Sequence, residues 1–410
     1  MKLLQVDTLE KAREKLEAAL AGRTPAVEPV SLDAAGGRVL AEDIVSGEEI
    51  PGFYRSSVDG YAVFSKDTQG ATESIPVFLE IIEEVAIGHP AKKTIKSGQC
   101  AYVPTGGMIP EGADAMVMVE YCELLDENEA AVYQSVPFGK FVVTPGEDVK
   151  CGQILLKRGT VIGPAQTGVL AAAGVTEVPV YVPWRVSILS TGDELVAPGE
   201  IPGPGQVRDI NTWALAAFAK QSGMCVVRKQ ALADEAVLLE TAIREAMKES
   251  DLVLTSGGSS QGKKDMTCEI LDRVSGGGVF THGLALKPGK PTILGFDGET
   301  ETLLVGLPGH PVAALTVFEL LLVWLWKKQT GQPEPVMTVA RMKTNLASAP
   351  GKTTCLLVKL TWEDGGYLAE PILGKSGLIS TMAEADGYVM VDMNQEGLQA
   401  GDVVQIHRFG

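Results

Sequence analysis

The pattern of hydrophobic and polar positions divides the chain into stretches of different periodicity. Residues 1–20 repeat apolar positions every three or four residues, which predicts an amphipathic helix, and they lack the apolar run of a signal peptide. Over residues 46–140, short apolar runs separated by Gly, Pro, Asn and Asp predict a β-rich domain. Residues 141–180 predict extended strands with one short helix near 164–173, and we expect them to pack with residues 1–45.

After Pro183 the pattern changes to alternating strands and helices. "RVSILS" predicts a strand, "NTWALAAFAKQSG" a helix ended by Gly223, and "DLVLTS" a buried strand. This alternation over residues 181–332 indicates a doubly wound, mostly parallel α/β domain. The apolar run 311–326 is short for a bilayer span and holds Glu319, so it predicts a buried helix. Residues 333–410 return to β-like segments, which predict a small β-barrel or sandwich.

Composition narrows the classes of function. A chain of 410 residues exceeds one ordinary core, which predicts two to four domains. The formal net charge of −17 argues against a nucleic-acid surface, although a few local cations can still bind a small anion. Six scattered cysteines without a CxxC motif predict free, mostly buried thiols in a cytoplasmic protein. We expect neither a membrane partner nor a nucleic-acid partner.

The stretch "LTSGGSSQGKKDMT" follows a predicted strand and precedes a predicted helix. In an open α/β sheet, ligands bind at this carboxyl end of the strands. Gly257 and Gly258 let a ligand approach the backbone, Ser256 and Ser259 add hydroxyl groups, and the helix N-terminus favours an anion. The loop therefore predicts a phosphate or oxyanion site, although it does not match the P-loop pattern. The alternative is a plain glycine turn.

Two further turns carry candidate ligand-binding residues. In "LALKPGKPTIL", Lys287 and Lys290 flank a turn stiffened by proline, where two ammonium groups could clamp an anion, and the alternative is two solvated lysines. In "LLVGLPGHPVAAL", a strand runs through Pro308 into a helix that begins at Pro311. His310 between them is a candidate titrating group, but a capping or packing role is the stronger expectation.

Carboxylates follow the same predicted strands. Asp193 and Glu194 come after the first strand of the α/β domain, in a turn that could serve a divalent cation with oxygen ligands. Asp209, Asp234 and Asp265 lie near the starts of predicted helices, so helix capping is the alternative for each of them. In the β-rich part, "SSVDGYA" and "PTGGMIPEGAD" are turn-rich, and the Asp–Gly pair of the first has a hairpin turn as its alternative.

Taken together, these segments resemble the molybdopterin molybdotransferases, the MoeA type that also forms the E domain of gephyrin. Eight motifs occur in the family order: "SSVDGYA", "PTGG.IPEGADA", "PGEDV..G", "STGDEL", "D.N", "TSGGSS.G..D", "LKPGKP" and "GLPGHPVAA". The resemblance implies an α/β multidomain fold. Its parts are an elongated domain of residues 1–45 and 141–180, a β-rich inserted domain (46–140), a MogA-like molybdopterin-binding α/β domain (181–332) and a small C-terminal β-barrel (333–410).

The resemblance also implies a reaction and a site. A homodimer with its active site between subunits would insert molybdate into adenylylated molybdopterin and release AMP with Mg²⁺, the last common step of molybdenum cofactor biosynthesis. The implied catalytic residues are Asp59, Thr105, Asp148, Glu194, Asp234 and Asp265. The implied metal ligands are Glu194, Asp234 and Asp265. The implied substrate-binding residues are Ser256, Gly257, Gly258, Ser259, Lys287, Lys290, Pro308, Pro311 and Ser376.

The chain departs from the family pattern at three places. Val58 replaces a methionine, His310 replaces the commoner asparagine, and Lys263 with Lys264 stands where relatives tend to carry acidic residues. The lysines leave tungstate open as the preferred oxyanion. The α/β domain alone also resembles molybdopterin adenylyltransferases and, less closely, CinA-type amidohydrolases, and a gephyrin-like scaffold is a further alternative. The long segments on both sides of that domain favour the molybdotransferase, for which adenylyltransferase and molybdopterin-delivering proteins are the expected partners.

Overall fold

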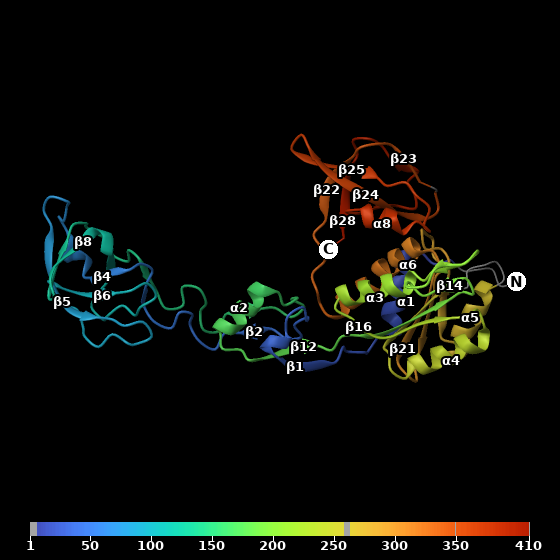
Figure 1. Ribbon diagram of the computed structural model, residues 1–410, viewed down its shortest axis with the longest axis horizontal. Helices are drawn as coiled ribbons and strands as arrows, with labels where there is room; N and C mark the ends of the chain where they lie inside the picture. Colours follow the sequence, from blue (N-terminus) through green and yellow to red (C-terminus); the bar gives the residue numbers. More distant parts are fainter. Residues whose placement is uncertain (1–5, 258–262, 349, 410) are drawn as a thin grey trace.

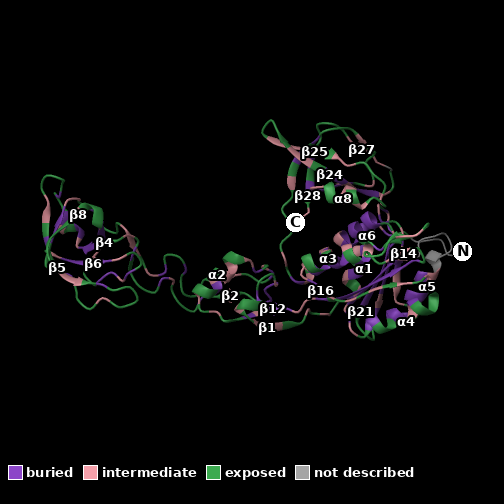
Figure 2. Cartoon of the chain, in the orientation of Figure 1, coloured by how far each residue is buried: buried purple, intermediate pink, exposed green. Residues whose placement is uncertain are grey.

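The computed structural model describes residues 6–257, 263–348 and 350–409. The molecule is elongated, with a β-rich part at one end and the α/β part and barrel at the other (Figure 1). Buried residues concentrate in the α/β part, whereas the segment that joins the two ends is mostly exposed (Figure 2). Among the described residues, no helix is both long and apolar enough to span a bilayer.

The β-rich part contains one six-stranded sheet in the order β7-β4-β6-β5-β9-β8. Strand β4, the second in this order, is buried on both faces, because Tyr61 and Val63 join one apolar cluster and Ala62 joins another. The strands are β4 (Gly60–Val63), β5 (Val77–Glu84), β6 (Gln99–Val103), β7 (Ala115–Met118), β8 (Cys122–Asp126) and β9 (Glu129–Val132). A sheet covered on both faces gives this part a core of its own.

The connecting part is built from two segments that lie far apart in the sequence. β1 (Val27–Ser31) pairs antiparallel with β12 (Glu177–Tyr181), and β2 (Ile44–Val45) pairs with β11 (Ile154–Leu156). The helix α2 (Pro164–Ala172) covers these ribbons and closes a small apolar cluster. These pairings align the outgoing and the returning chain side by side.

The first helix does not lie in this connecting part. α1 (Leu9–Ala19) contacts the last helices of the α/β part, and its buried face belongs to the largest apolar cluster there. The Arg13 guanidinium donates two hydrogen bonds, of 3.0 and 2.8 Å, to the backbone oxygen of Leu320 and lies over the Trp324 ring. The expectation that all of residues 1–45 belong to the elongated domain is therefore wrong for α1, because its apolar stripe packs elsewhere.

The α/β part has a six-stranded sheet in the order β16-β13-β17-β21-β20-β18. The first four strands pair in parallel, and β20 runs antiparallel to both of its neighbours, β21 and β18, as expected for a doubly wound, mostly parallel sheet. The strands are β13 (Arg185–Thr191), β16 (Cys225–Leu232), β17 (Leu252–Gly257), β18 (Val279–His282), β20 (Ile293–Asp297) and β21 (Thr302–Leu307).

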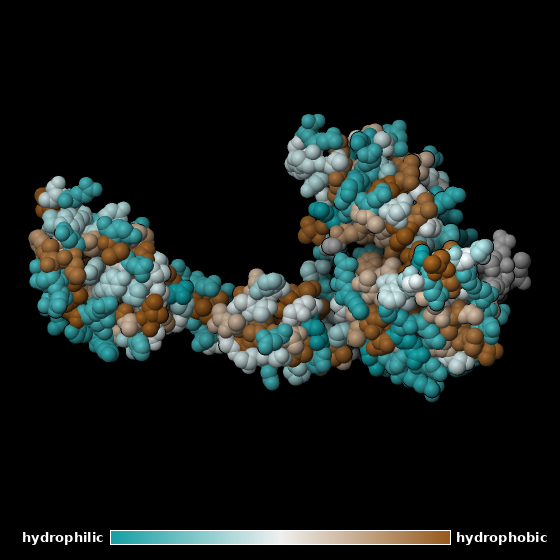
Figure 3. Space-filling view, in the orientation of Figure 1, coloured by the Kyte–Doolittle hydropathy of each residue, from teal (hydrophilic) through white to brown (hydrophobic). Residues whose placement is uncertain are grey.

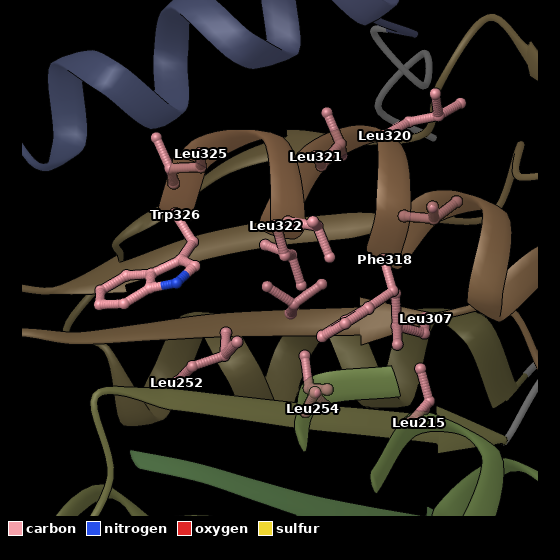
Figure 4. Packing of buried hydrophobic residues seen from close by; sticks show 14 of the residues in the cluster. Leu215, Leu252, Leu254, Leu307, Phe318, Leu320, Leu321, Leu322, Leu325 and Trp326 are labelled. Atoms are coloured by element: carbon pink, nitrogen blue, oxygen red, sulfur yellow. The ribbon is translucent and has the colours of Figure 1, made fainter. Parts of the chain in front are cut away.

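Helices cover both faces of this sheet. On one face, α3 (Asn211–Gln221), α6 (Pro311–Val317) and α7 (Trp324–Gln329) pack with α1 against Ile188 and Leu254. On the other face, α4 (Ala236–Met247) and α5 (Lys263–Val274) pack against Leu189 and Val253. The predicted helix over 311–326 is buried as expected, but a π-helical segment (Phe318–Val323) separates α6 from α7. Figure 4 shows Phe318, Leu322 and Trp326 directed at the sheet.

The C-terminal part is a closed β-barrel, so the barrel alternative is correct and the sandwich is not. Its strands follow the order β24-β25-β22-β28-β26, and a β24–β26 pairing closes the ring. They are β22 (Thr338–Met342), β24 (Thr353–Glu363), β25 (Gly366–Pro371), β26 (Gly387–Val391) and β28 (Val403–Arg408), with α8 (Ile379–Glu384) beside them. From the α/β part, β19 (Leu286–Lys287) pairs with β24 and connects the two domains.

Six short strands of the described chain form three further two-stranded sheets: β3 (Arg55–Ser56) with β10 (Val142–Val143), β14 (Leu195–Val196) with β15 (Val207–Arg208), and β23 (Leu346–Ala347) with β27 (Gly397–Leu398). None of the six cysteines, all of which lie in the described part of the chain, forms a disulfide. Cys100 and Cys355 are buried, but Cys151 and Cys225 are exposed, so the expectation of mostly buried thiols is wrong.

Candidate functional site

Parallel strands bring several of the sequence motifs to one edge of the α/β sheet. β13 ends at Thr191, which is paired with Leu232 of β16 and with Gly257 of β17, and Ser256 is paired with Leu307 of β21. The turns that follow these strands therefore emerge at the same edge. This is the carboxyl edge at which open α/β sheets bind ligands.

Asn211, the first residue of α3, ties two of these turns together. Its Nδ2 group donates to Ser256 Oγ at 2.6 Å and to the backbone oxygen of Gly309 at 2.8 Å. Ser256 Oγ in turn donates to the oxygen of Pro308 at 3.3 Å. The "D.N" motif marks this position in the sequence, but an amide that joins two turns becomes visible only in the fold, so Asn211 was not among the predicted site residues.

Steric crowding requires a glycine at the first position of the glycine-rich turn. Gly257 has a φ of 121°, and a Cβ atom there would lie 2.0 Å from the backbone oxygen of Thr191. Gly258 and Ser259 lie outside the described residues. Ser256 is buried, and its hydroxyl group is engaged by Asn211 and Pro308, so in this arrangement it fixes the turn.

A cavity of about 680 Å³ opens beside this edge, between the α/β part and the barrel. Lys287, Lys290, Pro308 and Ser376 of the predicted set all line it. Pro311 is buried at the start of α6, beside the lining residue Val312. The structure therefore brings together predicted residues that are up to 89 positions apart, from Lys287 to Ser376.

Two lysines from the barrel complete the cavity. Lys352 and Lys375 line it together with Lys287 and Lys290, and no Asp or Glu is among the described lining residues. Four ammonium groups without a carboxylate make the cavity suited to an anion. Sequence reasoning missed Lys352 and Lys375. In the sequence, each is a lysine beside a glycine in a predicted turn, in "PGKTT" and in "GKSG". Such turns are too common to indicate an anion-binding site.

Contacts between the two domains hold the barrel wall in place. Leu286 and Lys287 pair with Thr353 and Thr354 in parallel register, and the Thr353 backbone N–H donates to Ala285 O at 2.9 Å. Because backbone pairing fixes the position of the Lys287 backbone, the cavity depends on the barrel as well as on the α/β part.

The predicted metal ligands lie near the ends of β13 and β16. Glu194 is exposed, and its carboxylate lies near the Gly192 backbone, since a Cβ there would be 2.8 Å from Glu194 Oε2. The Asp234 backbone N–H donates to Asp193 Oδ1 at 3.0 Å, which holds the two turns together. Asp209 Oδ1 accepts the Thr212 N–H at 3.1 Å, as expected of its capping alternative.

The side chain of Asp265 lies outside the described part of the chain. Within that part, no group of three or more His, Cys, Asp or Glu side chains is arranged to hold a metal ion. Carboxylate oxygens are nevertheless the ligands that Mg²⁺ prefers, and Mg²⁺ commonly uses only one or two of them together with substrate phosphates and water. The donor set of Glu194 and Asp234 fits Mg²⁺ chemically.

Three predicted residues form a separate cluster in and beside the β-rich part. The Asp59 carboxylate accepts the Thr105 backbone N–H at 2.8 Å, so Asp59 is part of a contact between loops and not of a simple hairpin turn. β3 (Arg55–Ser56) pairs with β10 (Val142–Val143), and the Asp148 N–H donates to Ile50 O at 3.1 Å. Asp59, Thr105 and Asp148 are all exposed.

Within one chain, this cluster and the lysine-lined cavity do not meet. The β-rich part and the α/β part lie at opposite ends of the molecule, with the α2 region between them (Figure 1). One protomer therefore carries the predicted catalytic residues in two separate places.

A second, larger cavity of about 1200 Å³ lies where the connecting part, the α/β part and the barrel meet. Phe218, Glu319 and Arg158 are among its lining residues. Burial raises the pKa of Glu319, although Lys327 opposes the shift. In the space-filling view, hydrophobic residues appear where the barrel meets the α/β part, and also on the β-rich and connecting parts (Figure 3). The cavity holds none of the predicted site residues.

Family comparisons match nearly the whole chain in three consecutive segments. Residues 7–174 match the MoeA N-terminal region (domain I and II), residues 187–328 a probable molybdopterin binding domain, and residues 339–409 the MoeA C-terminal region (domain IV).

Individual relatives agree with this result. A molybdopterin molybdenumtransferase of Haemophilus influenzae is 32% identical over 409 residues, covering 98% of each chain. A molybdopterin molybdenumtransferase of Bacillus subtilis is 31% identical over 388 residues, covering 92% of this chain and 89% of the relative. Among solved structures, a molybdopterin biosynthesis MoeA protein of Pyrococcus horikoshii is 35% identical with a TM-score of 0.81, covering 99% of this chain and 100% of that one.

Proposed function

Because the chain belongs to the MoeA family, we propose that it is a molybdopterin molybdenumtransferase that inserts molybdate into adenylylated molybdopterin and releases AMP. The observation that carries this proposal is the cavity lined by four lysines and no described carboxylate. Molybdate is a dianion, and charge-assisted hydrogen bonds from ammonium groups are among the strongest that a protein offers an oxyanion.

The residues of the cavity would bind and orient the oxyanion. Lys287 and Lys290 approach from a turn of the α/β part, and Lys375 with Ser376 approaches from the barrel. Groups placed on opposite walls restrict the anion to one position, which favours the transfer by orientation and by compensating charge. The glycine turn at Gly257 would bring the backbone close to the phosphate of the adenylylated pterin.

Glu194 and Asp234 would hold Mg²⁺, with Asp265 as the third proposed ligand. Bound there, Mg²⁺ would neutralise phosphate charge and polarise the phosphate that links the pterin to AMP. The carboxylates themselves would keep the phosphate end of the substrate at the ends of β13 and β16, next to the cavity. The metal ligation is a proposal that rests on the chemistry of the donors.

Asp59, Thr105 and Asp148 would act on the same substrate from a second copy of the chain. Their distance from the cavity within one protomer supports a homodimer whose active sites combine the β-rich part of one subunit with the α/β part of the other. In this arrangement the exposed Asp59 and Asp148 carboxylates would orient the pterin or a water molecule.

One alternative enzyme is a molybdopterin adenylyltransferase. The barrel lysines Lys352 and Lys375 favour the molybdenumtransferase, because an isolated α/β domain would lack half of the cations in the cavity. A tungstate-preferring transferase would use the same site. We place the enzyme in the cytoplasm, with an adenylyltransferase and a molybdopterin-delivering protein as its partners.

The test is AMP release from adenylylated molybdopterin with Mg²⁺, measured with and without low micromolar molybdate. We expect release that depends on molybdate, and a KM for molybdate raised about tenfold or more in Lys290→Ala, since a hydrogen bond to a charged group contributes about 1.5–3 kcal/mol. Lys248→Ala is the matched control, because Lys248 is exposed at the end of α4, outside the cavity.

Two results would contradict the proposal. Absence of AMP release with either molybdate or tungstate would exclude the transferase. Equal effects of the Lys290 and Lys248 substitutions would show that the cavity does not bind the oxyanion. A preference for tungstate over molybdate would leave the proposed reaction type unchanged and identify tungstate as the oxyanion substrate.

A further inference from the structure

His310 lies at the junction of α6 and the barrel. It occupies the position before the first residue of α6, yet its side chain caps no backbone group of that helix. Instead, its Nδ1 atom lies 2.8 Å from Ser376 Oγ, and the Val312 N–H donates to Ser376 O at 3.1 Å. The barrel loop is thus attached to the start of α6 by one backbone bond and one titratable side chain. Both expected roles of His310 are wrong: its side chain makes no capping hydrogen bond, and it is exposed and not packed in a core.

The charges around His310 favour an anion. His310 and Ser376 both line the 680 Å³ cavity, whose other titratable lining residues are Lys287, Lys290, Lys352, Lys375 and Cys355. Burial raises the pKa of the Cys355 thiol, which favours its neutral form. Among the lining residues of the described chain, histidine is the one side-chain type whose charge ordinarily changes between pH 5 and 8.

The direction of the His310–Ser376 hydrogen bond decides what Ser376 can offer a ligand. A hydroxyl group has one hydrogen to donate. If Nδ1 accepts, that hydrogen points at the imidazole, and the Ser376 oxygen presents only its lone pairs to the cavity. If Nδ1 carries a proton and donates, the Ser376 hydrogen is free to point at an oxyanion. Protonation of His310 therefore adds a positive charge and also converts Ser376 into a donor.

From this geometry we propose that His310 is a positioning residue that orients the Ser376 hydroxyl toward the bound oxyanion and makes oxyanion affinity depend on pH. The inference rests on the proposed function, because it assigns a role within the same oxyanion site. A nearby opposite charge favours the charged form of a group, so oxyanion binding favours the imidazolium and takes up a proton. The imidazolium form therefore binds the oxyanion more tightly than the neutral form, so affinity falls as the pH rises.

The experiment is calorimetric titration of the full-length protein with sodium molybdate at pH 5.5, 7.0 and 8.5, with sodium sulfate as a second probe that does not titrate in this range. We expect the wild-type Kd for both anions to rise about tenfold from pH 5.5 to 8.5, since an opposite charge within about 4–6 Å shifts a protonation equilibrium at least that much. In His310→Gln, whose amide can still donate to Ser376, the dependence should disappear.

His89→Gln is the matched control, because His89 is exposed in the β-rich part and away from the cavity, and it should keep the wild-type pH dependence. Ser376→Ala should weaken binding at all three pH values and reduce the slope. Thermal unfolding of each variant identifies a variant that has failed to fold. A wild-type Kd that does not change with pH, or an unchanged slope in His310→Gln, would overturn the inference.

AMP release separates this inference from the proposed function. In the wild type, KM for molybdate should rise with pH, and His310→Gln should change KM at pH 6 more than kcat. Molybdate-dependent AMP release with the same KM profile in His310→Gln would refute the role of His310 and leave the transferase intact. Anion binding that depends on His310, without AMP release, would refute the transferase and retain the positioning role.

Discussion

At the residue scale, Gly257 joins the fold to the candidate site, because it ends β17 at the sheet edge with a positive φ and no room for a side chain. In Gly257→Ala, the new Cβ atom would lie 2.0 Å from the Thr191 oxygen, a backbone atom within the β13–β17 pairing. We expect the free energy of unfolding to fall by about 2 kcal/mol or more, from backbone strain and from the clash together. Chemical denaturation measures it.

Gly205→Ala separates the two contributions. Gly205 also has a positive φ, of 81°, but a Cβ atom there would meet nothing within 4 Å. The free energy of unfolding of Gly205→Ala should therefore fall by about 1 kcal/mol, from backbone strain alone. Equal losses in the two variants would show that the close approach of Gly257 to Thr191 has no energetic consequence.

Individual site residues differed in how far the sequence revealed them. Lys287 and Lys290 could be named because "LKPGKP" follows a strand of a recognisable sheet. Lys352 and Lys375 could not, because their turns reach the cavity only after the barrel docks on β19. The partnership of His310 with Ser376 spans 66 positions and two domains, and no local pattern encodes it.

At the scale of elements, the π-helical segment Phe318–Val323 places an acid next to a cavity in an otherwise apolar helix. Burial raises the pKa of Glu319 above its ordinary value. The protonated form is thus favoured in the folded state, and its stabilising effect is present below the ordinary carboxyl range and lost as pH rises through the folded pKa. Because an amide does not ionise, Glu319→Gln removes this loss of folding stability at high pH.

We therefore expect Glu319→Gln to melt a few degrees above the wild type at pH 8 and to match it at pH 4, in thermal unfolding followed by circular dichroism. A shift of about 2–4 °C corresponds to roughly 1 kcal/mol for a domain of this size. Glu127→Gln, in an exposed turn of the β-rich part, should show no such dependence. A Glu319 variant less stable than the wild type at pH 8 would mean that the carboxylate is stabilised by its surroundings.

Element types followed from periodicity more reliably than element partners did. The helices near 164–173 and 211–223 and the buried strand "DLVLTS" were predicted correctly, because each has its own apolar pattern and a glycine or proline at an end. The destination of α1 was predicted wrongly. Its stripe of Leu9, Ala12 and Leu16 shows that it packs against something, but the partner surface, α7 and the π-helical segment, lies 300 positions away.

At the scale of the whole molecule, the two clusters of predicted catalytic residues make a direct test of the proposed dimer possible. Asp59→Asn alters the cluster beside the β-rich part, and Lys287→Ala alters the cavity at the other end. If each active site combines the two ends from different subunits, both sites of each single-variant dimer are impaired. A mixed dimer then has one doubly altered site and one site with both native residues.

Equimolar mixing with subunit exchange should therefore restore AMP release to about a quarter of the wild-type rate, because half of the dimers are mixed and each has one intact site of two. Light scattering establishes the dimer, and a differential affinity tag on the two variants confirms exchange. The control is the double variant Asp59→Asn with Lys287→Ala, mixed with wild type. In these mixed dimers each of the two sites carries one altered residue and no site is native. They should therefore add nothing to the AMP release of the wild-type dimers in the mixture. No recovery in exchanged, folded mixed dimers would place both clusters in the site of a single chain, and would require the β-rich part to move toward the α/β part.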